Sequence, residues 1–210
     1  TILKTWSEGN LKEAEGLLRN ATRTYLLISI PAVVGVGCIS DILAKVLFDE
    51  LYWEGHHIMT SVALGMMMLG LTEYAIKSWE LNAQTKEIFK RSLVSGLFNI
   101  FLNLVFIKKY GYEFAGLSTF LAFLLYFILA NLGTRKSDLR FSVDKNSLLK
   151  IMLSALIMKS VLSSMKQLMG VSVVSLFILI VVGVVVYFTS LYFIGEIKDE
   201  VNYLKNKIKK

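Results

Sequence analysis

Six long apolar stretches alternate with polar segments along the chain. They cover about residues 25–48, 58–78, 92–107, 112–133, 148–169 and 171–195. Each is close to the ~20 residues that a helix needs to cross the hydrocarbon core of a bilayer. The pattern predicts an all-α fold, a polytopic bundle of six transmembrane helices.

The polar segments at the two ends are also patterned. Residues 10–24 predict an amphipathic helix that lies along the cytoplasmic membrane interface and runs into the first span, because apolar side chains recur on one face. These side chains are Leu11, Ala14, Leu17, Leu18, Ala21 and Tyr25. Residues 196–210 predict a second surface helix. Its apolar face carries Ile197, Val201, Leu204 and Ile208.

The predicted organisation has five parts. They are an interfacial helix over 1–24, spans one to four over 25–133, a basic loop over 134–147, spans five and six over 148–195, and an amphipathic tail over 196–210. Only the short segment from Lys108 to Glu113 joins spans three and four, so we expect a hairpin there, and a second hairpin around Gly170.

Composition excludes a water-soluble domain. Hydrophobic residues make up 55% of the chain and the mean hydropathy is +0.59, which leaves too little polar surface for a soluble protein. Cys38 is the single cysteine, so it can form no disulfide within the chain and is expected to be a small buried hydrophobic residue.

The net charge of +7 is distributed by side of the membrane rather than in one patch. Eighteen of the 23 basic residues fall in alternate polar stretches. They are Lys4, Lys12, Arg19, Arg23, Lys77, Lys86, Lys90, Arg91, Arg135, Lys136, Arg140, Lys145, Lys150, Lys198, Lys205, Lys207, Lys209 and Lys210. The positive-inside rule therefore predicts that both ends are cytoplasmic. The charge indicates topology and contact with membrane lipid, and no nucleic acid partner is expected.

Pro31 lies inside the first predicted span. A proline removes a backbone donor, and in a membrane this is tolerated only if a neighbour satisfies the freed carbonyl. We expect a structural kink at this position; a functional hinge is the alternative.

The third span carries its small and polar residues on one stripe. The stripe consists of Ser92, Ser95, Gly96, Asn99 and Asn103. Small residues and interhelical hydrogen bonds hold membrane helices together, so packing against another helix is the first interpretation. The second is that Asn99 and Asn103 line a polar route for a substrate.

Lys159 is an ionisable residue deep inside a predicted span, about 16 Å along the helix from Leu148. A lysine at the centre of a span costs ~2.5–3.5 kcal/mol, so something should compensate it. Ser160, Ser163, Ser164 and Gln167 surround it in the sequence. Lys159 and Ser163 are therefore candidates for a substrate path; the alternative is that Lys159 extends its ammonium to the interface.

Two carboxylates precede a lysine by four residues, the order that favours an ion pair on a helix. Glu73 is expected to pair with Lys77, and Asp41 with Lys45. A second interpretation gives Glu73 a role in coupling transport to a proton or cation.

Enzyme chemistry is not expected. His56 and His57 are adjacent, a spacing that suits neither a metal pair on a helix nor a catalytic triad. Asp41 and Glu73 are predicted near opposite faces of the bilayer and cannot act together. We predict no catalytic residue, no metal site and no cofactor.

The third and fourth spans resemble a known superfamily. Residues 99–111 (NIFLNLVFIKKYG), followed by Ala115, Gly116, Ser118, Thr119 and Tyr126, are similar to polysaccharide-type flippases of the multidrug, oligosaccharidyl-lipid and polysaccharide exporter superfamily. Ile30-Pro31 in the first span, Tyr187 in the last and the lysine-rich end agree with this resemblance.

The resemblance implies a transporter with two lobes that gives alternating access to a central cavity, with these six spans in the second lobe. It implies a lipid-diphosphate-linked oligosaccharide as substrate, exported across a prokaryotic cell membrane for cell-surface polysaccharide synthesis.

A diphosphate in the membrane should be met by cations. All five arginines, Arg19, Arg23, Arg91, Arg135 and Arg140, fall in predicted cytoplasmic stretches. We therefore expect the main substrate clamp to belong to a missing amino-terminal lobe of the same protein.

Two other functions stay open. A cation-coupled drug or metabolite antiporter of the same superfamily would need a carboxylate cluster deep in a lobe. A membrane scaffold for polysaccharide enzymes would transport nothing.

Overall fold

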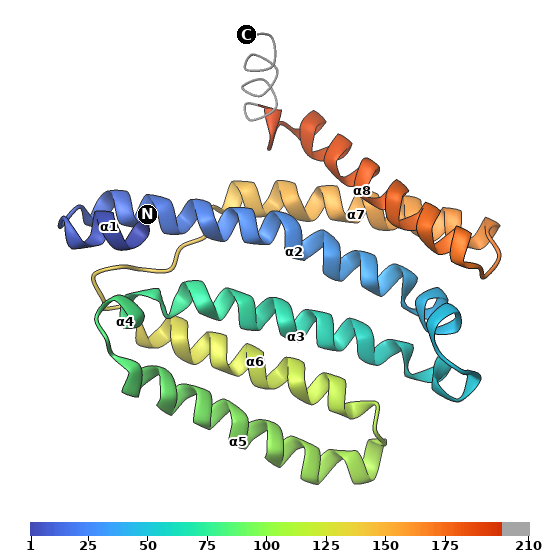
Figure 1. Cartoon of the computed structure of the whole chain (residues 1–210), viewed down its shortest axis with the longest axis horizontal. Helices are drawn as coiled ribbons and strands as arrows, with labels where there is room; N and C mark the ends of the chain where they lie inside the picture. Colours follow the sequence, from blue (N-terminus) through green and yellow to red (C-terminus); the bar gives the residue numbers. More distant parts are fainter. Residues whose placement is uncertain (199–210) are drawn as a thin grey trace. The chain divides into compact units, whose positions relative to one another are not determined.

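The computed structural model describes residues 1–198, in which the regular secondary structure is helical (Figure 1). The elements in chain order are α1 (Ile2–Ser7), α2 (Leu11–Leu47), the 3-10 helix η1 (Glu50–Gly55), α3 (His56–Ala75), α4 (Lys77–Leu81), α5 (Thr85–Tyr110), α6 (Phe114–Gly133), α7 (Lys145–Leu168) and α8 (Val173–Ile194). Six of the described helices are long and apolar enough to cross a membrane, as predicted. Most of the predicted amphipathic tail, including Val201, Leu204 and Ile208, lies outside the described residues.

The predicted interfacial helix and the first span are one continuous helix, α2, of 37 residues. The helix is longer than a bilayer core requires, because the amphipathic sequence before Tyr25 continues directly into the apolar one. Asn10 supports its start, since its side-chain amide donates to Glu13 Oε2 at 2.7 Å.

The chain divides into two compact units. The first contains Thr1–Tyr25 and His57–Val143, and the second contains Leu26–His56 and the chain from Asp144 onward. The helix α2 therefore contributes its first part to one unit and its second part to the other.

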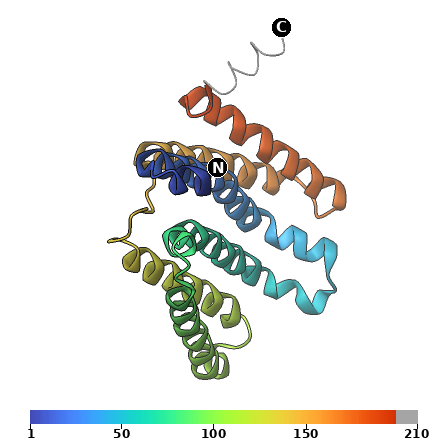
Figure 2. The same cartoon turned by 60° about the vertical axis from the view of Figure 1, so that its left-hand side comes forward.

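The first unit is built on α3, α5 and α6. In both views α5 and α6 run side by side as the predicted hairpin (Figures 1 and 2). Glycines let α3 and α6 approach closely. A Cβ at Gly116 of α6 would lie 3.2 Å from the carbonyl oxygen of Ile58, and one at Gly65 of α3 would lie 3.2 Å from Cα of Phe120. Small residues let helix backbones approach in a membrane, where no hydrophobic effect drives them together.

The first unit contains a small hydrophobic core between α2 and the basic loop. Ala14 and Leu18 of α2 are buried with Leu139, a residue of the basic loop. Arg19 Nε also donates to Ser142 Oγ at 3.2 Å. The loop predicted over 134–147 is therefore held against the amphipathic part of α2 by both apolar and polar contacts.

The second unit contains the rest of α2 with the hairpin of α7 and α8. Asp144 caps α7 by accepting from Asn146 N at 2.9 Å, and Ser172 caps α8 by accepting from Ser175 N at 3.0 Å. Such caps satisfy backbone donors that a helix leaves unpaired at its start. Gly195, at φ +79°, ends α8 in the left-handed conformation that favours glycine.

Candidate functional site: a polar pocket between α2 and α7

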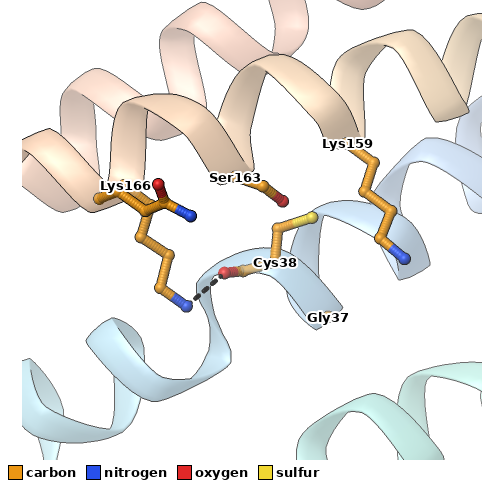
Figure 3. A pocket seen from close by; sticks show the side chains of 6 residues that line it. Gly37, Cys38, Lys159, Ser163 and Lys166 are labelled. Carbon is orange, nitrogen blue, oxygen red and sulfur yellow. Dashed lines mark hydrogen bonds between the residues drawn. The ribbon is translucent and has the colours of Figure 1, made fainter.

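A polar pocket of about 420 Å³ lies between α2 and α7 in the second unit (Figure 3). Its lining residues are Gly37 and Cys38 from α2 and Lys159, Ser163, Lys166 and Gln167 from α7. The α7 residues are spaced i, i+4, i+7 and i+8, so they occupy one face of that helix. We call this cavity the polar pocket.

Lys166 is held at one side of the polar pocket. Its ammonium donates to Asp41 Oδ1 at 2.6 Å and to the Cys38 carbonyl at 3.1 Å. The side chains of Lys166 and Asp41 are 32% and 29% exposed, so the ion pair is partly buried. Lys166 therefore has its charge balanced by Asp41 and two of its three donors engaged.

This pair corrects the expected bond between Asp41 and Lys45. A bond within α2 would give each group one partner, whereas Lys166 contacts the carboxylate and a backbone carbonyl together. The Lys45 ammonium instead lies 5.8 Å from the centre of the Trp53 ring.

Lys159 projects from the same helix toward α2 at the other side of the polar pocket, and the Ser163 hydroxyl lies between the two lysines beside Cys38 (Figure 3). Within residues 1–198 the Lys159 ammonium makes no ion pair or hydrogen bond, and its side chain is exposed. The structure brings Lys159 and Ser163 together as the sequence suggested; whether they contact a substrate stays a prediction.

Pro31 lies in α2 before the residues that line the polar pocket. Because proline has no backbone N–H, the carbonyl of Leu27, four residues earlier, has no donor within the helix. The buried hydroxyl of Tyr187, on α8, donates to this carbonyl at 2.8 Å. The neighbour that a proline in a span requires is therefore Tyr187. The sequence predicted the need for a partner but could not identify it.

The polar stripe of α5 lies in the first unit and faces α6. Ser118 Oγ donates to Asn103 Oδ1 at 2.5 Å, and Asn103 Nδ2 donates to Asn99 Oδ1 at 3.1 Å. Ser95 Oγ donates to the Ala122 carbonyl at 2.6 Å. These bonds are those that helix packing requires, while a route along Asn99 and Asn103 stays a prediction.

Glu73 lies near the end of α3, and its expected ion pair with Lys77 is wrong. The helix breaks at Ile76, between α3 and α4, so the i, i+4 spacing no longer places the two side chains together. Lys77 pairs with Glu80 instead. The coupling role of Glu73 stays a prediction.

Sequence reasoning missed a charged cluster at the start of α7. Glu196 is only 8% exposed, accepts a hydrogen bond from Ser147 Oγ, and lies 3.5 Å from the Lys150 ammonium. The sequence pattern predicted Glu196 in a surface tail. No local pattern indicated that its carboxylate is buried, because its partner Ser147 is 49 residues away in the sequence.

Metal chemistry has no support in the part of the chain that the structure describes. In residues 1–198, no three His, Cys, Asp or Glu side chains lie together in a way that could hold a metal ion.

Comparison with known proteins identifies relatives over nearly the whole chain. The family described as "Lipid II flippase MurJ" matches residues 1–196. The probable low-salt glycan biosynthesis flippase Agl15 of Haloferax volcanii is 26% identical over 187 residues, which are 88% of this chain and 39% of that protein.

A solved structure has the same fold. The structure of the lipid II flippase MurJ in an inward closed conformation superposes with a TM-score of 0.78 at 22% identity, over 95% of this chain and 42% of that one. The chain thus spans about two fifths of the length of the proteins it matches.

Proposed function

The chain belongs to the lipid II flippase MurJ family, a family of membrane transporters and not of enzymes, and on this premise we propose that it forms part of a flippase for a lipid-diphosphate-linked oligosaccharide. The observation that carries the proposal is the family match over residues 1–196, together with six helices that can span a membrane. The relative in Haloferax volcanii is described as a flippase for glycan biosynthesis, which supports a glycan as the transported group.

Transport would occur by alternating access in a cell membrane of a prokaryote. The distribution of basic residues supports a cytoplasmic position for both ends of this chain. Because the chain spans about two fifths of its relatives, the partner that completes the cavity would be an amino-terminal lobe of the same protein.

The proposed route passes the face of α7 that carries Lys159 and Ser163, where a cation and a hydroxyl line the polar pocket. Asn99 and Asn103 are further candidates for the route, and Glu73 is the candidate for coupling to an ion gradient.

The test is a transfer assay with the full-length protein. Membrane vesicles from cells with and without the protein would be loaded with a radiolabelled lipid-linked oligosaccharide on the cytoplasmic leaflet. We expect transfer to the opposite leaflet only when the protein is present. Normal glycan transfer without the protein would contradict the proposal, and a scaffold would lower glycan synthesis while leaving leaflet transfer unchanged.

A further inference from the structure

The polar pocket carries an unbalanced positive charge. It is lined by the ammonium groups of Lys159 and Lys166, and the one carboxylate bonded to either of them within residues 1–198 is that of Asp41. Asp41 and the Cys38 carbonyl accept from Lys166, and no described residue supplies a counter-ion for Lys159.

Lys159 lies far from both ends of α7. The residue lies fourteen positions after the first residue of α7, Lys145, and nine before the last, Leu168. These separations correspond to about 21 Å and about 14 Å along the helix, and both exceed the reach of a four-carbon side chain. An ammonium near the middle of a membrane-spanning helix is costly unless a partner at the same depth compensates it.

The neighbours of Lys159 fit an anion with several oxygens. Ser163 and Gln167 follow it on the same face of α7 and supply a hydroxyl and an amide, both able to donate hydrogen bonds. Gly37, on the α2 wall, has no side chain to fill the space opposite (Figure 3). Lysine binds phosphate as a point charge, and phosphate groups are the anions that membrane lipids carry.

We propose that the polar pocket is a phosphate-binding site in which Lys159 is the primary cation and Ser163 and Gln167 donate to the phosphate oxygens. The proposal rests on the proposed function for its preferred ligand, the diphosphate of a lipid-linked oligosaccharide. The phosphate of a membrane phospholipid has the same chemistry and is the second source to be tested.

Asp41 gives the polar pocket its selectivity. Because it already binds Lys166, it lowers the positive charge of the cavity and places a carboxylate near its edge. An anion is therefore attracted at the Lys159 side and repelled at the Asp41 side. Removing the carboxylate should strengthen phosphate binding by releasing Lys166.

The experiment measures equilibrium binding to the full-length protein, purified in a neutral detergent, by native mass spectrometry. The probes are farnesyl diphosphate, farnesol, dioleoylphosphatidylglycerol and inorganic pyrophosphate. The variants are Lys159→Ala, Lys159→Arg and, as a matched control, Lys108→Ala, which removes an exposed lysine at the end of α5.

We expect Lys159→Ala to weaken binding of a phosphate-bearing probe by about tenfold or more, the worth of a hydrogen bond to a charged group. Lys159→Arg and Lys108→Ala should bind as the parent does. Selective loss for farnesyl diphosphate would identify the isoprenoid substrate as the source, and selective loss for dioleoylphosphatidylglycerol would identify a phospholipid. Inorganic pyrophosphate shows whether the headgroup suffices.

Equal binding by the parent and Lys159→Ala, or equal affinity for farnesol and farnesyl diphosphate, would overturn the phosphate site. The binding result is independent of the transfer assay. A failed transfer assay would contradict the proposed flippase function but not the phosphate site. A further variant is Asp41→Ala, measured at a temperature at which it is folded. Weaker phosphate binding than in the parent would also contradict the assignment, because that change should increase affinity.

Discussion

Two polar clusters lie within the helical spans, and they satisfy their polar groups differently. On α5 and α6, Asn99, Asn103 and Ser118 are neutral and bond to one another. In the polar pocket, Lys166 has acceptors but Lys159 has none within residues 1–198. A neutral network needs no further partner, whereas an unbalanced cation calls for an anion, so the first cluster is suited to packing and the second to binding.

The largest stability effect is expected where a charge is left alone in the polar pocket. Asp41→Ala removes the partner of Lys166 and should lower the free energy of unfolding by about 2–3 kcal/mol, below the range for fully buried pairs because both side chains are about 30% exposed. The measurement is thermal unfolding of the purified protein in detergent.

The control for this change is the double variant Asp41→Ala, Lys166→Met. It removes both charges, so most of the lost stability should return. A double variant as unstable as Asp41→Ala would mean that packing of the aspartate, and not its charge, stabilises the unit.

A smaller effect is expected in the neutral stripe. Asn99→Leu removes the acceptor of Asn103 Nδ2 and the donor nearest Ser118, and should cost about 1–2 kcal/mol. We expect a lower yield of monodisperse protein by size-exclusion chromatography, with transport per folded molecule preserved.

Ser92→Leu is the matched control, since it makes the same polar-to-apolar change at an exposed position on α5. If Asn99→Leu folded normally but lost transport, the two clusters would no longer differ in role, and the α5 stripe would belong to the substrate route.

The hydrogen bond from Tyr187 to the Leu27 carbonyl is expected to stabilise the protein less than the α5 network, because it is a single neutral bond. Tyr187→Phe leaves the Leu27 carbonyl without its donor and should cost about 1 kcal/mol. In the background Pro31→Ala the helix regains its own donor to Leu27, so Tyr187→Phe should then cost little. Equal costs in the two backgrounds would show that the hydroxyl acts independently of the proline.

The sequence was sufficient for the features that depend on solvent and on local spacing. Six spans and the two hairpins follow from the apolar stretches and the short connections, and the need for a partner at Pro31 follows from its chemistry. The identity of that partner did not follow, because Tyr187 is 160 residues from Leu27.

Ion pairs were the least predictable features of the chain. Local spacing suggested a bond between Glu73 and Lys77, but a helix end at Ile76 separates them. The partner of Asp41 is 125 residues away and is chosen by packing of α2 on α7. That Lys166 has an ion pair whereas Lys159 has none within residues 1–198 could therefore be found only from the structure.

The smallest stability effect is expected at Lys159, and it separates the two clusters most sharply. Lys159→Met keeps a long side chain and removes a cation that no described residue compensates, so the free energy of unfolding should change by less than about 0.5 kcal/mol or should rise. Lys166→Met removes a bonded cation and should destabilise the protein. Parallel melting curves of the two variants make the comparison. A large loss of stability for Lys159→Met alone would mean that its ammonium has a structural partner, and the polar pocket would then resemble the closed network of α5 and α6.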